Sequence, residues 1–379
     1  MHPIVVQKYG GSSVADVERL GKVADRVLAT VKSGKRVVVV VSAMGKTTDE
    51  LIALAKSIAP APPRRELDML LSTGERISMA LLAMALETRG LSAISFTGSQ
   101  SGILTNDRHS GARIIEVRPV RIEDELDRDR VVIIAGFQGM SYRREITTLG
   151  RGGSDTTAVA MAAALSADCE IYSDVDGVYS ADPKVVTDAK HLAQIGYEEM
   201  QELAEHGAKV LNAQAVEWAR KAQITIYARA TSGSTKETKI GPEAASISSS
   251  HALTGQAIAV TGQTVMKASG PPEILRVLAE NHVTLRSASP DAVRFCLSDI
   301  PDWPRVERLL HQVGAVCAEE GQVSAVGPGV GSNAQILSRV LEIVGQIITG
   351  YEASPLRLTL HLPKAQISDV TRAIHAALC

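Results

Sequence analysis

The sequence predicts an α/β fold with a largely parallel sheet, followed by two small α+β modules. Up to about residue 230, short β-branched runs alternate with longer helical patterns, and this alternation is typical of α/β layer proteins. The predicted strands are continuous apolar runs, as parallel strands buried on both faces are. After a change in composition, the remaining residues carry a weak internal repeat.

Each element of the first region has a local signal. Runs of apolar, mostly β-branched residues predict strands at residues 4–6, 37–41, 131–135 and 170–172. Helical patterns are predicted at residues 14–32, 76–89 and 156–165, so that Glu75 is expected to open a helix. Residues 231–255 are rich in Ser, Gly, Thr and Lys without apolar periodicity, which indicates a connection between domains.

The internal repeat predicts two copies of one module. The helical fragment 274–278 is echoed by 336–341, and Ala-Ser-Pro precedes both predicted strands 293–297 and 356–362. Each copy ends in an amphipathic helix, at 303–313 and 368–378. This order is a ferredoxin-like βαββαβ pattern that lacks only its last strand. Chance similarity of two short stretches is the alternative, whereas paired modules after a catalytic domain indicate regulation or assembly.

Composition narrows the class of protein. The 379 residues have room for two or three domains. A net charge of −2 and an aromatic content of 3% disfavour nucleic-acid partners, and no apolar run reaches the length of a membrane span. The four scattered cysteines fit neither a zinc site nor a disulfide framework, and the N-terminus lacks a secretory signal. A cytoplasmic enzyme with reduced thiols and no protein-bound metal site is therefore expected.

The first polar motif follows the first predicted strand. Lys8, Gly10 and Gly11 belong to Lys-Tyr-Gly-Gly-Ser-Ser, between that strand and the next helix. Glycines at such a turn let backbone N–H groups approach an anion, and the helix N-terminus adds positive potential. The lysine can place its charge among phosphoryl oxygens, although a purely structural turn has the same composition. Neither a P-loop nor a dinucleotide-binding glycine fingerprint follows a predicted strand.

Two further polar loops are candidate binding segments. Ser-Ala-Met-Gly-Lys-Thr-Thr, from Ser42, directly follows strand 37–41, and open α/β sheets bind ligands at the carboxyl ends of strands. Residues 148–157 read Thr-Leu-Gly-Arg-Gly-Gly-Ser-Asp-Thr-Thr. The Arg151 guanidinium, flanked by glycines, suits a carboxylate. Asp155 lies where the next helix begins, and capping that helix is its alternative role.

A third loop and one acidic residue complete the candidates. Residues 173–184 follow strand 170–172 with polar groups and an aromatic ring that can hold a nucleotide, although a turn-rich structural loop would look similar. Glu75 can receive a substrate ammonium group, or it can be an ordinary residue favoured by the helix dipole.

Taken in order, these motifs closely resemble the aspartate kinase family of amino-acid kinases. The resemblance runs from residue 4 to about residue 230 and includes Lys-Tyr-Gly-Gly-Ser-Ser at Lys8, Ser-Ala-Met-Gly-Lys-Thr-Thr at Ser42, Gly-Glu-Arg-Ile-Ser at Gly74, Phe-Thr-Gly-Ser-Gln-Ser-Gly at Phe96, Arg-Gly-Gly-Ser-Asp-Thr-Thr at Arg151 and Tyr-Ser-Asp-Val-Asp-Gly-Val-Tyr at Tyr172. It implies a three-layer αβα sandwich with a mainly parallel sheet, followed by two ferredoxin-like ACT-type domains. The implied activity is phosphorylation of the β-carboxylate of L-aspartate by ATP and Mg²⁺, the first step toward lysine, threonine and methionine.

The resemblance also implies roles for individual residues. Catalysis is assigned to Lys8, which would bridge the phosphates, and to Asp155, which would organise Lys8 and the metal-bound phosphates. For aspartate, Arg151 would hold the α-carboxylate and Glu75 the ammonium group, and the rest of the substrate site is assigned to Thr47, Thr48, Gly152, Gly153 and Ser154. The nucleotide site is assigned to Lys8, Gly10, Gly11, Ser42, Ser173, Asp174, Tyr179, Asp182, Lys184 and Lys209.

The resemblance further implies a kinase domain at residues 1–232, a linker at 233–256, and ACT-like domains at 257–321 and 322–379. The C-terminal part departs from the family pattern. The family's Asp-x-Pro-Gly effector loop is replaced by Ser-Gly-Pro-Pro from Ser269, and its Ser-Thr-Ser-Glu strand by residues 350–355. Effector binding is therefore expected to be weakened or lost, leaving the repeats mainly to form a homo-oligomer. Strong inhibition by low concentrations of lysine or threonine would refute this expectation.

Two other functions compete with this interpretation. The first is an amino-acid kinase that acts on glutamate or on an acetylated amino acid, but with an N-acylated substrate Glu75 would face a nitrogen without a charge. The second is a catalytically idle regulatory subunit, which would not need to keep Lys8, Arg151 and Asp155. Because a carboxylate acceptor is already ionised at neutral pH, no general base is required. His109 and His206 are therefore expected to be structural.

Overall fold

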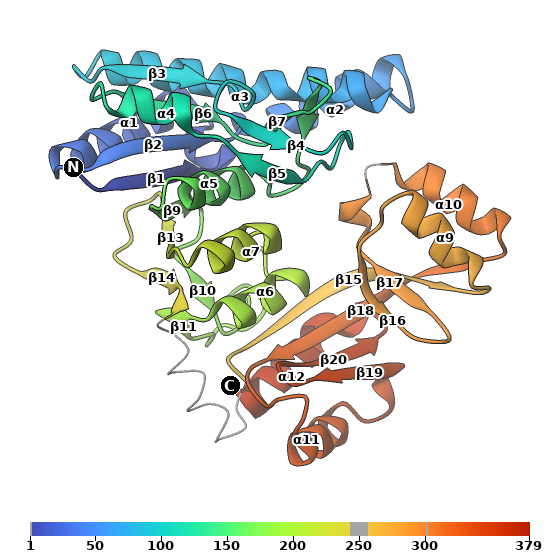
Figure 1. The fold of residues 1–379 in the computed structure, drawn as a ribbon. Helices are drawn as coiled ribbons and strands as arrows, with labels where there is room; N and C mark the ends of the chain where they lie inside the picture. The colour runs from blue at the N-terminus through green and yellow to red at the C-terminus, as the bar shows by residue number, and fades with distance from the viewer. Residues whose placement is uncertain (1, 243–256, 301) are drawn as a thin grey trace. The chain divides into compact units, whose positions relative to one another are not determined.

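The computed structural model describes residues 2–242, 257–300 and 302–379. The chain divides into two compact units (Figure 1). The first comprises Met1–Val178 with Val210–Pro242, and the second comprises Tyr179–Lys209 with Glu243–Cys379.

A largely parallel sheet forms the centre of the first unit. Its strands in that unit lie in the order β14-β13-β9-β1-β2-β6-β3. Their bounds are β1 (Ile4–Tyr9), β2 (Arg36–Val41), β3 (Ala93–Phe96), β6 (Val131–Ala135), β9 (Asp168–Ser173), β13 (Ile226–Ala230) and β14 (Glu237–Ile240). All neighbours pair in parallel except β13 and β14, which pair antiparallel. The parallel sheet predicted from the apolar runs is therefore confirmed.

Helices cover both faces of this sheet, which gives three layers. Apolar side chains of α1 (Val17–Lys32) and α3 (Arg64–Glu87) form one core with alternate residues of β1, β2 and β6. On the opposite face, α5 (Gly153–Ala164) packs against β1, β2 and β9, and α7 (Ala213–Ala222) packs on α5. The unit also contains α2 (Thr47–Ile58), which packs on α3, and α4 (Val120–Leu126), which packs on β6. Residues 37–41 of β2 are all valine because both faces of the strand are buried there.

A smaller four-stranded sheet lies in the same unit, in the order β5-β4-β7-β8. It consists of β4 (Ile103–Thr105), β5 (Ile114–Val117), β7 (Gln138–Ser141) and β8 (Ile146–Thr148). These strands are 3 or 4 residues long, too short for a clear sequence signal. They position the loops at 106–113 and 149–152 described below.

Helix α3 begins earlier than the sequence pattern predicted. It spans 24 residues and starts at Arg64, after Pro62 and Pro63. The prediction that Glu75 opens a helix is therefore wrong, because Glu75 lies in the middle of α3. By length and composition alone, α3 is apolar enough to cross a membrane. In the structure, 44% of its 18-residue apolar stretch is buried inside the protein. In the structure it packs against β3, β6 and β8 and carries buried polar residues, as a core helix of a sheet domain does.

The second unit is built around a six-stranded sheet in the order β16-β17-β15-β18-β20-β19. Its strands are β15 (Ala259–Ser269), β16 (Leu285–Ala288), β17 (Val293–Phe295), β18 (Val316–Val326), β19 (Gly350–Ser354) and β20 (Arg357–Leu362). Its helices α9 (Glu273–Glu280), α10 (Trp303–Gln312), α11 (Ala334–Val344) and α12 (Ile367–Leu378) match the predicted repeat.

The two repeats share their central strands. Strands β15 and β18 are each 11 residues long and pair antiparallel over their whole length. Met266 and Ala268 of β15 pack in the core of the first repeat, together with Phe295, whereas Val260 packs with Val323 in the core of the second. Each repeat thus completes its sheet with half of the other's long strand, which explains why the sequence of each copy lacks a last strand.

The segment from Tyr179 to Lys209 belongs to the second unit although it precedes the predicted linker. It contains α6 (Tyr197–Glu205), β11 (His191–Leu192) and β12 (Gln194–Ile195), and β10 (Val178–Tyr179) lies at its start. Ser180 anchors it, since its carbonyl accepts a bond from the Val260 N–H and its hydroxyl lies 2.8 Å from His375 Nε2. Within the predicted linker, Glu237–Ile240 form β14, and residues 243–256 lie outside the described part of the chain.

Candidate active site

Three predicted binding loops of the first unit, those that follow β1, β2 and β9, meet at the carboxyl edge of its parallel sheet. Strands β1, β2, β6 and β9 run in the same direction, so the residues that follow each strand lie at one edge. Backbone bonds join these loops: the Ser42 N–H donates to the Tyr9 carbonyl at 3.1 Å, and the Gly45 N–H to the Gly11 carbonyl at 3.0 Å. A ligand at this edge would therefore contact several loops at once.

Lys8 and Asp155 form an ion pair at this edge. Lys8 Nζ lies 2.6 Å from Asp155 Oδ1, and both side chains are largely buried. Lys8 points to the α5 face of the sheet because side chains alternate along β1, and Asp155 lies in the first turn of α5. The helix N-terminus and the lysine together give the positive potential that phosphoryl oxygens require.

Gly10 and Gly11 keep the space beside Lys8 open. A Cβ atom on Gly11 would lie 2.8 Å from the Ala43 carbonyl oxygen, a distance that real Cβ atoms do not adopt, and one on Gly10 would lie 3.4 Å from Lys8 Nζ. Side chains at these positions would push the β2 loop away or cover the ammonium group. The close approach of the β2 loop therefore excludes a side chain at Gly11, whereas a side chain at Gly10 would lie at ordinary contact distance from the ammonium group.

Glu75 reaches the same edge from helix α3. Its side chain is only 3% exposed, and Oε1 accepts a hydrogen bond from the Ala43 N–H at 3.1 Å. Within the described residues, Oε2 has no hydrogen-bond partner. Burial raises the pKa of Glu75 to about 7, although the bond from Ala43 opposes this shift. A buried carboxylate with one free oxygen is suited to a cationic group of a ligand.

The Arg151 loop leads directly into α5. Gly150 and Gly152 have positive φ angles of 76° and 71°, which a side chain would strain. A Cβ atom on Gly152 would lie 2.6 Å from Asn212 Nδ2, and that amide donates to the Arg151 carbonyl at 3.0 Å. Arg151 and Gly152 are exposed, whereas Gly153 and Ser154 are buried at the start of α5. The loop backbone is thus fixed while the guanidinium faces solvent.

Thr47 and Thr48, at the start of α2, lie beside the same loops. The Thr47 hydroxyl donates to the Met44 carbonyl at 2.7 Å. A Cβ atom on Gly74 would lie 3.6 Å from Thr47 Cγ2, so Thr47 is close to the turn of α3 that carries Glu75. Both threonines are half-buried, as residues lining a pocket would be.

Sequence and structure comparisons identify the family to which this geometry belongs. Residues 3–228 match the model of the amino acid kinase family. An aspartokinase of Mycolicibacterium smegmatis is 41% identical over 404 aligned residues, which cover 99% of this chain and 96% of that protein. An aspartokinase of Corynebacterium glutamicum is 42% identical over 400 aligned residues, with 98% and 95% covered. The chain belongs to the aspartokinase family of amino acid kinases.

The fold agrees with that family throughout the chain. A crystal structure of E. coli aspartokinase III in complex with aspartate and ADP superposes with a TM-score of 0.84, at 24% identity and with 99% of each chain covered. That likeness establishes the fold of both units as that of an aspartokinase.

The residues predicted to bind the nucleotide are divided between the two units. Lys8, Gly10, Gly11, Ser42, Ser173 and Asp174 lie in the first unit. There the Gly10 N–H donates to the Tyr172 carbonyl at 3.2 Å, which places the Lys8 turn beside the end of β9. Tyr179, Asp182, Lys184 and Lys209 lie in the second unit, where the last three are exposed. Their joint role with Lys8 stays a prediction.

No group of three or more His, Cys, Asp or Glu residues in the described ranges could hold a metal ion. All four cysteines are free in the structure.

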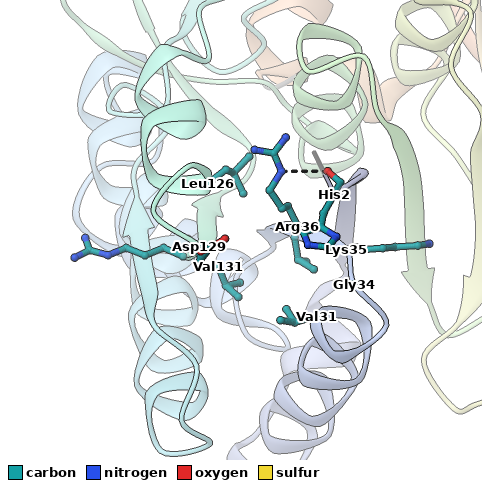
Figure 2. A pocket seen from close by; sticks show the side chains of 10 residues that line it. His2, Val31, Gly34, Lys35, Arg36, Leu126, Asp129 and Val131 are labelled. Carbon is teal, nitrogen blue, oxygen red and sulfur yellow. Dashed lines mark hydrogen bonds between the residues drawn. The ribbon is translucent and has the colours of Figure 1, made fainter.

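A cavity of about 140 Å³ lies elsewhere in the first unit, at the amino ends of β2 and β6 (Figure 2). Arg36 at its edge donates to the His2 carbonyl at 3.2 Å and pairs with Asp127 at 2.9 Å. None of the predicted site residues lines this cavity. Parallel sheets bind ligands at the carboxyl ends of strands, and this cavity lies at the opposite, amino edge.

Two residues near the site carried no usable sequence signal. Asn212 holds the Arg151 carbonyl from the start of α7, and Asp68 of α3 accepts bonds from the loops beside Arg151. Both act through contacts between segments far apart in the chain, which no local motif reveals. The predicted structural role of His109 fits its position, because its Nδ1 lies 2.8 Å from Asp68 Oδ2.

Proposed function

We propose that this chain transfers the γ-phosphoryl group of ATP to the β-carboxylate of L-aspartate and so forms 4-phospho-L-aspartate. The proposal rests on one observation: the buried Lys8–Asp155 pair and the Glu75 carboxylate lie at the same edge of the sheet. One oxygen of Glu75 accepts a hydrogen bond, and the other has no partner within the described residues. Lys8 supplies charge for phosphoryl oxygens, and Glu75 supplies charge for an ammonium group. The crystal structure of E. coli aspartokinase III with aspartate and ADP supports the same pair of ligands.

The proposed reaction needs positioning rather than acid–base catalysis. The acceptor carboxylate is ionised at neutral pH and attacks the γ-phosphorus without losing a proton. The bond from phosphorus to the bridging oxygen breaks, and ADP leaves with the negative charge. Catalysis then rests on alignment of the two ligands and on neutralising the phosphoryl oxygens. Lys8 performs the second task, while Arg151 and Glu75 orient aspartate by its α-carboxylate and ammonium groups.

Mg²⁺ would enter this site with the nucleotide. The ion usually keeps several waters and binds through one or two carboxylates together with substrate phosphates. The site fits such an ion, since Asp155 is the carboxylate beside the phosphate-facing lysine. Bound there, Mg²⁺ would neutralise charge on the phosphate chain. Asp155 also holds Lys8 in place.

Assembly is a separate part of the proposal. Tandem ACT-type modules indicate a homo-oligomer formed through the second unit, and the product would enter synthesis of aspartate-derived amino acids in the cytoplasm. The altered residues at 269–272 and 350–355 favour weak feedback control. In the structure residues 350–354 form β19, the edge strand of the six-stranded sheet.

ADP release with aspartate, glutamate and N-acetylglutamate as separate acceptors tests the proposal. Adding hydroxylamine traps an acyl phosphate as its hydroxamate and distinguishes transfer from ATP hydrolysis. Turnover with hydroxamate formation is expected for aspartate, with kcat/KM at least about tenfold lower for glutamate because one additional methylene misplaces the acceptor. Equal turnover of glutamate or N-acetylglutamate, or none with aspartate, would overturn the assignment.

A further inference from the structure

Asp68 is a buried charged group that the proposed reaction does not use. It lies on α3 with 0% of its surface exposed. Glu75 follows two helical turns later, at about 3.6 residues per turn, so both carboxylates project from the same face of α3. One helix therefore carries a site residue and, beside it, a second buried acid.

The Asp68 carboxylate is surrounded by donors from two loops. The Ser110 N–H lies 3.0 Å from Oδ1 and 3.1 Å from Oδ2, and His109 Nδ1 lies 2.8 Å from Oδ2. From the other loop, the Thr148 hydroxyl donates to Oδ1 at 2.6 Å and its N–H to Oδ2 at 3.2 Å. Hydrogen bonds to an ionisable acceptor are among the strongest in proteins. Asp68 therefore ties both loops to α3.

These loops form the base of the Arg151 segment. Thr148 ends β8 and stands three residues before Arg151. The Ala112 N–H donates to the Thr148 carbonyl at 2.8 Å, and a Cβ atom on Gly150 would lie 3.8 Å from Gly111 Cα. The 106–113 loop thus packs directly against the turn that leads to Arg151. A shift at Thr148 would move the Arg151 backbone with it.

We propose that Asp68 is a positioning residue for recognition of the acceptor amino acid. It fixes the loop that carries Arg151 to the helix that carries Glu75. Asp68 would then fix the spacing between the two side chains that bind the α-carboxylate and the ammonium group. This inference rests on the proposed function and adds Asp68 to it as the residue that sets the spacing between Arg151 and Glu75. Lys8 and Asp155 pair directly with each other at 2.6 Å, so we expect a change at Asp68 to affect binding of aspartate more than binding of ATP.

Steady-state kinetics of Thr148→Val and Thr148→Ser test the inference. Valine has nearly the shape of threonine and keeps the N–H bond, but it lacks the hydroxyl that donates to Oδ1, whereas serine retains the hydroxyl. Thr148→Val is expected to raise KM for aspartate about tenfold, the effect of one bond to a charged group, with KM for ATP within about twofold. Thr148→Ser is expected to stay near the wild type. Thr73→Val is the matched control, since its exposed hydroxyl donates to the Leu70 carbonyl of its own helix.

Asp68→Asn tests the same idea with a larger change. Its amide NH₂ would face backbone N–H groups, so we expect KM for aspartate to rise about 100-fold while KM for ATP changes little. The Thr148 pair still decides the matter if this variant fails to fold. Equal KM values for Thr148→Val and Thr148→Ser would overturn the role of Asp68, as would a parallel rise in both substrates' KM values. A wild-type protein without turnover on aspartate would instead overturn the proposed function itself.

Discussion

Replacing Lys8 by alanine is expected to lower kcat for phosphoryl transfer by at least about 10³-fold. Loss of a single group that stabilises developing charge costs about 10² to 10³ in kcat, and removal of a cation from a phosphoryl-transfer site costs about 10³ to 10⁵. The structure adds a reason for a large effect. Without Lys8, the buried Asp155 carboxylate loses its partner at 2.6 Å and repels the phosphates.

The measurement is kcat from coupled ADP release, together with calorimetric titration of ATP to separate binding from catalysis. Lys22→Ala is the matched control, because Lys22 pairs with Glu18 at 2.7 Å on the exposed side of α1. That surface pair contributes little, and the control should retain wild-type kcat. A kcat for Lys8→Ala within about tenfold of wild type would show that Lys8 does not stabilise the transferred group.

Local signals in the sequence were sufficient for four strands of the central sheet, β1, β2, β6 and β9, but not for β3, β13 and β14. Strand β6 and residues 37–41 of β2 are buried on both faces and therefore consist of apolar residues alone, which makes them recognisable in the sequence. These features depend on residues next to one another in the chain.

Features that depend on distant contacts were not predictable. The helix that carries Glu75 was placed too late because its first turn, with Arg64, Arg65 and Glu66, has the composition of an exposed loop. The exchange of half-strands between β15 and β18 requires pairing across about 50 residues, which an internal repeat alone does not reveal. Asp68 has a role only because the loops at Ser110 and Thr148 reach it in space.

The Glu75→Gln variant is expected to lower kcat/KM for aspartate by about 10² to 10³ at pH 8, with KM for ATP nearly unchanged. Glutamine retains the shape and can still accept the Ala43 N–H, but it removes the negative charge that would face the ammonium group. Loss of one partner of a buried, hydrogen-bonded charge pair costs about 2 to 5 kcal/mol. Glu87→Gln is the control, because Glu87 makes a similar bond to the Ala93 N–H at 2.8 Å at the exposed end of the same helix.

The pH dependence of the same variant separates charge from shape. With the pKa of Glu75 raised to about 7, wild-type kcat/KM for aspartate should fall tenfold per pH unit below that value, because protonation removes the charge that binds ammonium. Glu75→Gln should lack this limb.

The same substitution should change the pH dependence of the free energy of unfolding. A carboxyl group whose pKa is raised on folding stabilises the unliganded protein at low pH, and that contribution is lost as pH rises through about 7. The variant should therefore melt a few degrees higher than wild type at pH 8. If kcat/KM of the variant still fell at acidic pH, Glu75 would not be the ligand of the ammonium group. If the variant melted lower than wild type at pH 8, the buried charge of Glu75 would not lower stability.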